Sequence, residues 1–336
     1  MDIRIVRSLS KDVWHRFVEQ HPAGNIFHTP EMFEVFSRAL GHKPQFWAAI
    51  DRENILALFL PVEISLAGGL LRPLTTRAVV YGSILCSCNQ NIDIVLNELF
   101  LNYKHVVKRQ ILFTEMRNLT DGGDLQPIFQ SAGFKFEGHN NYIVDLALPE
   151  EKVWNNIHKS ARKKILQAQR RSLLSIREID DKLMLPAWYS LMQKSFLWNH
   201  TPLPDISLFE AAFDVLYPKH MIQFLIGSLN DRHVAASVAL LYKDKIYGWY
   251  RSFDRTYSDC MPNDQMVWHV FKWGTENGFS SFDFGGAGRP DEKYGPRNFK
   301  AKFGGALVNY GRNTFIHAPL QLKLSTLGYR LFRRIL

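Results

Sequence analysis

Two lysines near residue 300 lie in an aromatic tract and have the chemistry that acyl transfer needs. The tract runs Asn298-Phe299-Lys300-Ala301-Lys302-Phe303-Gly304-Gly305. A period of two would put Lys300 and Lys302 on one face of a strand, with Phe299 on the other. Two neighbouring cations can bind a phosphate, or stabilise the oxyanion that develops when an amine attacks a carbonyl. We therefore predict Lys300 and Lys302 as catalytic residues and Phe299 as a substrate contact.

A carboxylate precedes this tract within an apolar strand. Asp283 lies between two phenylalanines, and Gly285 and Gly286 follow it. An unpaired carboxylate is costly in such a strand, so Asp283 is expected to have a partner. A purely structural pairing with a lysine or arginine is the alternative to a catalytic role. The glycines let the backbone turn sharply and let a ligand approach, so we predict that Gly285 and Gly286 bind substrate.

Basic side chains follow a helix that the sequence predicts from Glu150 to Arg171. Apolar residues recur on one face at helical spacing, and Arg162 and Lys163 fall on roughly the opposite face. Such a basic stripe is typical of a phosphate-binding surface. It is equally typical of an ordinary amphipathic helix with a solvated side. Arg162 and Lys163 are therefore predicted to bind substrate, with a solvated face as the alternative.

Three further side chains are predicted to line a cleft. Tyr250 and Arg251 end a predicted strand, and Tyr294 lies in the loop before the lysine tract. For Tyr250, a place in the aromatic core is the alternative. The sequence shows no Ser-His-Asp or Cys-His arrangement, so we expect direct transfer to an amine without a covalent enzyme intermediate.

The elements that must position these residues occur in the same order in both halves of the chain. Each half has a strand, helices, a hairpin, a helix and a final strand, which is typical of a layered α/β (α+β) fold with mixed, largely antiparallel sheets. We expect one domain at 1–147 and a second at 148–316. Residues 317–336 mix leucines with Arg330, Arg333 and Arg334, which predicts a basic amphipathic helix. It is expected to dock on the core or, alternatively, to lie on a membrane surface.

The composition is that of a globular protein with a basic surface. The 336 residues carry a net charge of +9, which suits an anionic partner such as RNA, a phosphorylated substrate or a membrane surface. The N-terminus lacks the apolar segment of a signal peptide. Cys86, Cys88 and Cys260 indicate free thiols rather than a disulfide framework or a metal site. We expect a cytoplasmic protein, with peripheral contact at the inner membrane face as a further option.

These segments together resemble the FemABX family and related acetyltransferase-like (GNAT-like) proteins. The resemblance rests on Trp154 to Ile165, the Pro262-Asn263 helix start, Phe282-Asp283-Phe284-Gly285 and Phe299-Lys300-x-x-Phe303-Gly304. It covers nearly the whole chain and is strongest from Trp154 to Gly305. It implies two tandem GNAT-like domains and a role in building the peptidoglycan interpeptide bridge.

The resemblance also implies the two substrates. The donor would be an aminoacyl-tRNA, and the acceptor would be the amine of a nucleotide- or lipid-linked muropeptide whose diphosphate is held by basic residues. Lys300 would lie near the reacting carbonyl, with its neighbour Lys302 as the alternative. The long coiled-coil insertion of many family members is absent between Arg171 and Met221, where two ordinary helices are expected.

An acyl-CoA is the main alternative donor. GNAT enzymes bind its pyrophosphate on a glycine-rich turn that opens a helix, where backbone amides attract anions. The corresponding stretch here runs from Ser252 to Asn263. It contains Asp254 and Asp259, Asp264 follows it directly, and it has no glycine. Carboxylates would repel a pyrophosphate, which favours aminoacyl-tRNA.

Two other classes of function stay open at this point. A non-catalytic RNA-binding module would account for the basic helix and the net charge, and a degenerate GNAT pair would act as a scaffold. No permanently bound cofactor, no metal and no DNA partner is expected in any of these cases.

Overall fold

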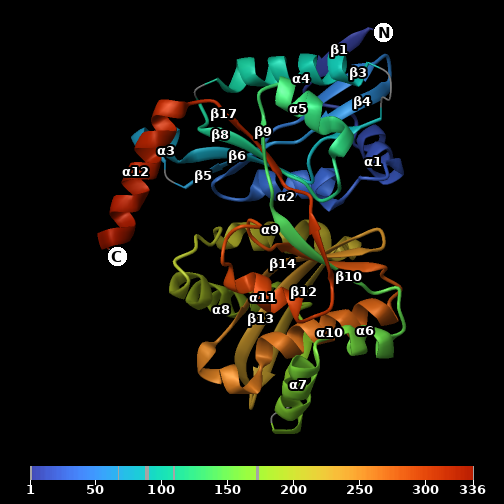
Figure 1. Ribbon diagram of the computed structural model, residues 1–336, viewed down its shortest axis with the longest axis vertical. Coiled ribbons are helices and arrows are strands. Elements are labelled where there is room, and N and C mark those ends of the chain that lie inside the picture. Colours follow the sequence, from blue (N-terminus) through green and yellow to red (C-terminus); the bar gives the residue numbers. More distant parts are fainter. Residues whose placement is uncertain (1, 67, 88–90, 109, 172–173, 336) are drawn as a thin grey trace. The chain divides into compact units, whose positions relative to one another are not determined.

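The computed structural model describes residues 2–66, 68–87, 91–108, 110–171 and 174–335. They form two units: Met1–Gly138 together with Tyr310–Leu336 (unit 1), and His139–Asn309 (unit 2). Both units combine helices with β-sheets, as Figure 1 shows. The predicted layered α/β fold with two tandem halves is confirmed. Cys88 lies outside the described residues, whereas Cys86 and Cys260 are half-buried.

Unit 2 contains a seven-stranded sheet. Every neighbouring pair is antiparallel except β14 and β15, which run parallel. In spatial order the strands are β11 (Ser175–Glu178), β12 (Ile222–Leu229), β13 (Arg232–Tyr242), β14 (Lys245–Phe253), β15 (Ser281–Gly286), β10 (Asn140–Asp145) and β16 (Ala306–Asn309).

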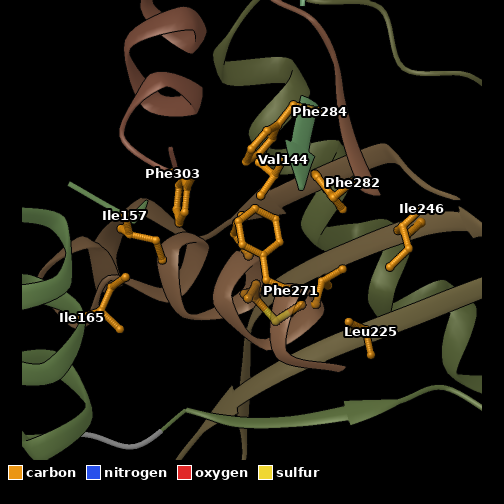
Figure 2. Close-up of a cluster of buried hydrophobic side chains, with 14 of the residues drawn as sticks. Val144, Ile157, Ile165, Leu225, Ile246, Phe271, Phe282, Phe284 and Phe303 are labelled. Carbon is orange, nitrogen blue, oxygen red and sulfur yellow. The ribbon is translucent and has the colours of Figure 1, made fainter. Parts of the chain in front are cut away.

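The helices of unit 2 are α6 (Glu150–Asn156), α7 (Lys159–Arg171), α8 (Leu185–Trp198), α9 (Ile206–Leu216), α10 (Pro262–Glu276) and α11 (Gly295–Ala301). Among them, α8, α9 and α10 pack against strands of this sheet. Phe271 of α10 lies at the centre of the core, with ring centroids 5.1 Å from Phe282 and 5.7 Å from both Phe284 and Phe303 (Figure 2). Burial of such rings stabilises the strand on which Asp283 lies.

Unit 1 contains two sheets. The four-stranded sheet has the order β1 (Ile3–Val6), β3 (Trp47–Asp51), β4 (Asn54–Phe59) and β7 (Leu85–Cys86). The six-stranded sheet has the order β2 (His42–Pro44), β5 (Val62–Ser65), β6 (Thr76–Tyr81), β8 (Phe113–Arg117), β17 (Arg312–Ile316) and β9 (Lys135–Glu137). Its helices are α1 (Lys11–Gln20), α2 (Pro30–Arg38), α3 (Arg72–Thr75), α4 (Ile92–Val107), α5 (Gln126–Ser131) and α12 (Pro319–Ile335).

Two pairs of strands that adjoin in sequence belong to different sheets. β9 is followed directly by β10, yet β9 pairs with β17 in unit 1 while β10 pairs with β15 and β16 in unit 2. In the same way β16 stays in unit 2, and the next strand, β17, lies between β8 and β9 in unit 1. We call this arrangement the strand exchange. Two simple hairpins would pair β9 with β10 and β16 with β17. Instead, β10 joins the sheet of unit 2 and β17 joins the six-stranded sheet of unit 1.

The strand exchange places the division of the chain elsewhere than the expected domains 1–147, 148–316 and 317–336. By contacts, unit 2 begins at His139, because β10 completes its sheet, and unit 1 resumes at Tyr310, because β17 completes the other. The terminal helix α12 belongs to unit 1. The side chains of Arg330, Arg333 and Arg334 lie outside the described residues.

Two predicted elements are wrong in detail. The expected single helix from Glu150 to Arg171 is two helices, because the chain is extended at Ile157 and the His158 amide donates to the Lys302 carbonyl at 2.8 Å. The expected strand around Lys300 is the helix α11, which begins with Pro296 in its first turn. Lys300 and Lys302 therefore do not share a strand face.

Candidate active site

A parallel pair of strands in unit 2 diverges and leaves a cavity. The registered pairs between β14 and β15 end at Tyr247 and Asp283, although β14 continues to Phe253. On its other side, β14 pairs Gly248 with Ala239 and Tyr250 with Val238, which leaves Trp249 as an extra residue. This bulge bends β14 away at the point where pairing with β15 stops.

The cavity has a volume of about 510 Å³ and lies wholly within unit 2. Its walls are largely aromatic and apolar, and its polar side chains come from α8, from the loop after α8 and from β13. The lining includes Ser195, Phe196, Asn199, Thr201, Ser237, Trp249, Tyr250, Arg251, Phe282, Phe284, Tyr294 and Lys300. The two charged residues among the described lining are cations, Arg251 and Lys300.

Lys300 lines the cavity, and backbone carbonyls hold its ammonium group in place. Its side chain is nearly buried, and Nζ donates to the carbonyls of Phe284 at 2.7 Å, Gly285 at 2.9 Å and Gly286 at 2.7 Å. An ammonium has three N–H donors, so this turn engages all of them. Burial, and then the charge of Arg251, lower the pKa of Lys300 to about 7.

Asp283 also holds this turn, through the Gly285 amide. Its Oδ1 accepts from Asn141 Nδ2 and from the Gly285 amide, both at 2.6 Å. Gly285 has φ +68, a conformation that favours glycine. Burial raises the pKa of Asp283, and these two hydrogen bonds oppose that rise. The expected partner of Asp283 is thus an asparagine and a backbone amide, and Asp283 positions the turn without lining the cavity.

Arg251 projects a second cation into the cavity. Its guanidinium carbon lies 4.7 Å from the Phe299 ring centroid and 5.8 Å from that of Phe284. Within the described part of the chain, the guanidinium has no hydrogen-bond or ion-pair partner. Burial lowers its pKa to about 10, and the carboxylate of Asp264 opposes that shift.

Lys302 points elsewhere and has a structural partner. Its Nζ forms an ion pair with Asp264, in the first turn of α10, and lies 4.2 Å from the Phe299 ring centroid. Asp264 is 5% exposed, so the pair fastens α11 to the start of α10 in a mostly dry setting. Lys302 is absent from the described lining of the cavity.

The remaining predicted residues divide between the cavity and the surface. Tyr250 and Tyr294 line the cavity, and Phe299 lies beneath Arg251. Arg162 is half-buried on α7 and donates to Asn155 Oδ1, while Lys163 is exposed. Neither basic residue lines the cavity, so their substrate-binding role stays a prediction.

Sequence reasoning missed the polar lining and the partner of Asp283. Ser195, Asn199, Thr201 and Ser237 line the cavity, but nothing in their spacing marks them. Asn141 reaches Asp283 across 142 positions of sequence. One signal was available for the bulge, since a glycine inside a predicted strand, here Gly248, often marks one.

The corresponding strand pair in unit 1 is closed. β6 and β8 stay paired from Ala78 with Thr114 to their last residues, Tyr81 with Arg117. The ring of Tyr81 stacks on two phenylalanine rings from the preceding helical segments, with centroids 5.0 and 5.6 Å away. Glu115 forms ion pairs with Arg117 at 2.7 Å and with Arg312 of β17 at 3.2 Å.

The described residues form neither a metal-binding cluster nor a membrane-spanning helix. They contain no group of three or more His, Cys, Asp or Glu side chains that could hold a metal ion. None of their helices is long and apolar enough to cross a membrane.

Comparisons with known proteins agree with the resemblance seen in the sequence. Residues 155–300, which lie within unit 2, match the family model described as an acetyltransferase (GNAT) domain. No curated protein matches the chain. The chain is similar to the crystal structure of FemX, with 16% identity and a TM-score of 0.71, over 97% of this chain and 99% of that one.

Two further solved structures share the fold. The C-terminal domain of a putative lysylphosphatidylglycerol synthetase from Agrobacterium fabrum has 12% identity and a TM-score of 0.57, over 94% of each chain. A tandem GNAT protein from the clavulanic acid biosynthesis pathway has 9% identity and a TM-score of 0.55, over 95% of this chain and 99% of that one. At these identities the likeness shows the tandem GNAT fold.

Proposed function

We propose that the chain transfers an activated acyl or aminoacyl group onto an amine and forms an amide, as an acyltransferase or aminoacyltransferase of class EC 2.3. The observation that carries this proposal is Lys300, buried at the end of a cavity in a GNAT-type domain and held on the carbonyls of a glycine turn. A cation fixed in a largely apolar cavity stabilises negative charge more strongly than it would in water.

The reaction requires little from side chains beyond position and charge. The neutral amine attacks the carbonyl carbon, and the C–N bond forms while the carbonyl oxygen gains negative charge. The bond from that carbon to the leaving oxygen or sulfur then breaks, and the proton lost by the amine goes to the leaving group or to solvent. Lys300 supplies positive potential for the oxyanion that develops on the carbonyl, and Asp283 keeps the Gly285 turn in place.

We favour an aminoacyl-tRNA as the donor, with an acyl-CoA as the alternative. Where a GNAT enzyme would bind pyrophosphate, the start of α10 carries Asp264, whose carboxylate already holds Lys302. Asp254, just before it, accepts from the Thr256 amide and hydroxyl. Carboxylates at a helix start repel a pyrophosphate. The resemblance to the FemABX family, together with the structural similarity to FemX, supports the same choice.

For the acceptor, we propose an amine on a phosphorylated or lipid-linked molecule of cell-wall synthesis, reached in the cytoplasm or at the inner membrane face. The similarity to FemX and to a lysylphosphatidylglycerol synthetase supports this class of acceptor. The net charge of +9 suits an anionic partner.

The test is a transfer assay with both donors. The protein is incubated with charged tRNAs or with acetyl-CoA, and with lysine-containing muropeptide precursors, and mass spectrometry detects the amide product. We expect product with a charged tRNA, lost in Lys300→Met. Product with acetyl-CoA alone would change the donor. If neither donor gives product while tRNA binds in a salt-dependent way, the chain is an RNA-binding module, for which the exposed basic side of α7 is the supporting observation.

A further inference from the structure

The two cations of the unit 2 cavity, Lys300 and Arg251, differ in how many N–H donors are available to a ligand. All three N–H donors of Lys300 point to backbone carbonyls. Direct binding of a ligand by Lys300 would break one of these bonds. The guanidinium of Arg251 has five donors, and the described residues provide no acceptor for them.

The nearest carboxylate does not satisfy Arg251. Asp264 acts on Arg251 only through its charge, because its ion pair is with Lys302. The described residues that line the cavity include no aspartate or glutamate. A desolvated guanidinium without an acceptor is costly, and an arriving anion would relieve that cost.

The neighbours of Arg251 hold it in place without using its donors. The guanidinium carbon lies 4.7 Å from the ring centroid of Phe299 and 5.8 Å from that of Phe284, so ring contacts restrain the group and use none of its N–H donors. A planar fork of this kind matches a carboxylate or a phosphate in two parallel hydrogen bonds. Lys300 adds positive potential beside it, which an anion would neutralise in part.

We infer that the unit 2 cavity selects a substrate group that carries an oxyanion, a carboxylate or a phosphate, and that Arg251 is the residue that binds it. The walls beside Arg251 include Phe196, Trp249 and Tyr294, so the oxyanion is carried on an apolar or aromatic body. A group whose only charge is positive is disfavoured there. The inference deepens the proposed transferase function and names the substrate class of the same cavity.

The experiment measures binding and requires no donor. Isothermal titration calorimetry of the full chain compares N-acetylphenylalanine with its neutral amide, and phenyl phosphate with phenol. We expect the acid to bind about 10- to 100-fold more tightly than the amide, as one charge-assisted pair provides. A preference for phenyl phosphate over the acid would identify phosphate as the natural group, and the reverse would identify carboxylate.

Matched variants assign the selectivity to one residue. Arg251→Gln should bring the acid and the amide to equal affinity, and Arg251→Lys should keep part of the preference, because the charge remains while the fork is lost. Arg232→Gln is the control, since it removes the same charge from an exposed position of β13. Circular dichroism checks that each variant is folded.

Two results would overturn the inference: equal binding of acid and amide by the unaltered chain, or an acid preference that survives in a folded Arg251→Gln. If that variant does not fold, the comparison in the unaltered chain still decides. Failure of the transferase proposal is seen separately. If the chain binds oxyanions through Arg251 but transfers no group from any donor, the transferase proposal is wrong and the binding site at Arg251 still stands.

Discussion

The two parallel strand pairs of the chain have the same neighbours and different ends. In unit 2, β14 and β15 lie between β13 and β10, and in unit 1, β6 and β8 lie between β5 and β17, with the same strand directions at each step. In unit 2 the pair opens after three registered positions, and a cavity with two cations follows. In unit 1 the pair stays closed to its ends, and its charges are joined in ion pairs.

The comparison teaches what distinguishes a site from a scaffold built on one framework. The strand order and directions that both units share set where a cavity can open. In unit 2 it opens because β14 has a bulge at Trp249 and its pairing with β15 ends at Tyr247. In unit 1, the rings stacked on Tyr81 and the ion pairs of Glu115 occupy the corresponding end of the strands. We therefore expect substitutions of the cavity cations in unit 2 to affect transfer, and substitutions at the closed strand end of unit 1 to affect stability.

The largest effect is expected from Lys300→Met. This change removes the ammonium from the glycine turn and from the cavity, and methionine has a similar length. Loss of one fixed electrostatic group of this kind reduces turnover by about 10²–10³-fold. The amide product is measured by mass spectrometry, with melting temperature as the folding control. Unimpaired transfer in the folded variant would break the distinction between the two units.

Lys302→Met tests the neighbouring lysine and should act mainly on stability. It leaves Asp264 nearly buried without its cation, which costs about 1–3 kcal/mol of unfolding free energy. Urea denaturation measures the loss, and Lys302→Arg should restore most of it. Transfer should persist in Lys302→Met. Loss of transfer at unchanged stability would move the catalytic role from Lys300 to Lys302.

The pKa of Lys300 predicts a pH dependence of stability. A lysine in the unfolded chain has a pKa of about 10.4, and in the fold that of Lys300 is lowered to about 7. Between these values the unfolded state binds more protons, so unfolding free energy rises with pH, by up to about 1.4 kcal/mol per pH unit. Below pH 7 the contribution is constant. Denaturation at pH 7, 8 and 9 should show this slope in the unaltered chain and its loss in Lys300→Met; equal slopes would contradict the assignment.

The smallest effect is expected from Glu115→Gln in unit 1. Arg117 and Arg312 lower the pKa of this carboxyl, and the change removes their charge partner. Because both arginines are partly exposed, the loss of unfolding free energy should be about 1 kcal/mol. Transfer should be unchanged in the same assay. A large loss of transfer would show that the closed end of unit 1 also belongs to the functional site.

The sequence carried the chemistry of the site further than its geometry. The sequence predicted a turn with charged neighbours after the aromatic strand of Asp283. In the structure Asp283 and Lys300 both bind that glycine turn. The predicted strand conformation of the tract was wrong, since a period of two over the five residues from Phe299 to Phe303 cannot outweigh Pro296 at a helix start.

The strand exchange had no sequence signal. Strands separated by a short turn usually pair with each other, and the short linkers after β9 and β16 give no sign that their strands join different sheets. Which sheet receives a strand depends on packing far along the chain, as when Asn141 reaches Asp283. The same dependence hid the polar lining of the cavity.

The strand exchange has a consequence for how the chain is made. β17 is the strand between β8 and β9, and the ribosome must add all of unit 2, residues 139 to 309, before β17 emerges. At about 5–20 residues per second, those 171 residues take roughly 9–34 s. During that time the nascent first unit has an open edge at β8, which is a surface that other strands can join. While unit 2 is being synthesised, a ribosome-associated chaperone that covers this edge, or a low rate of expression, would therefore raise the yield of native protein.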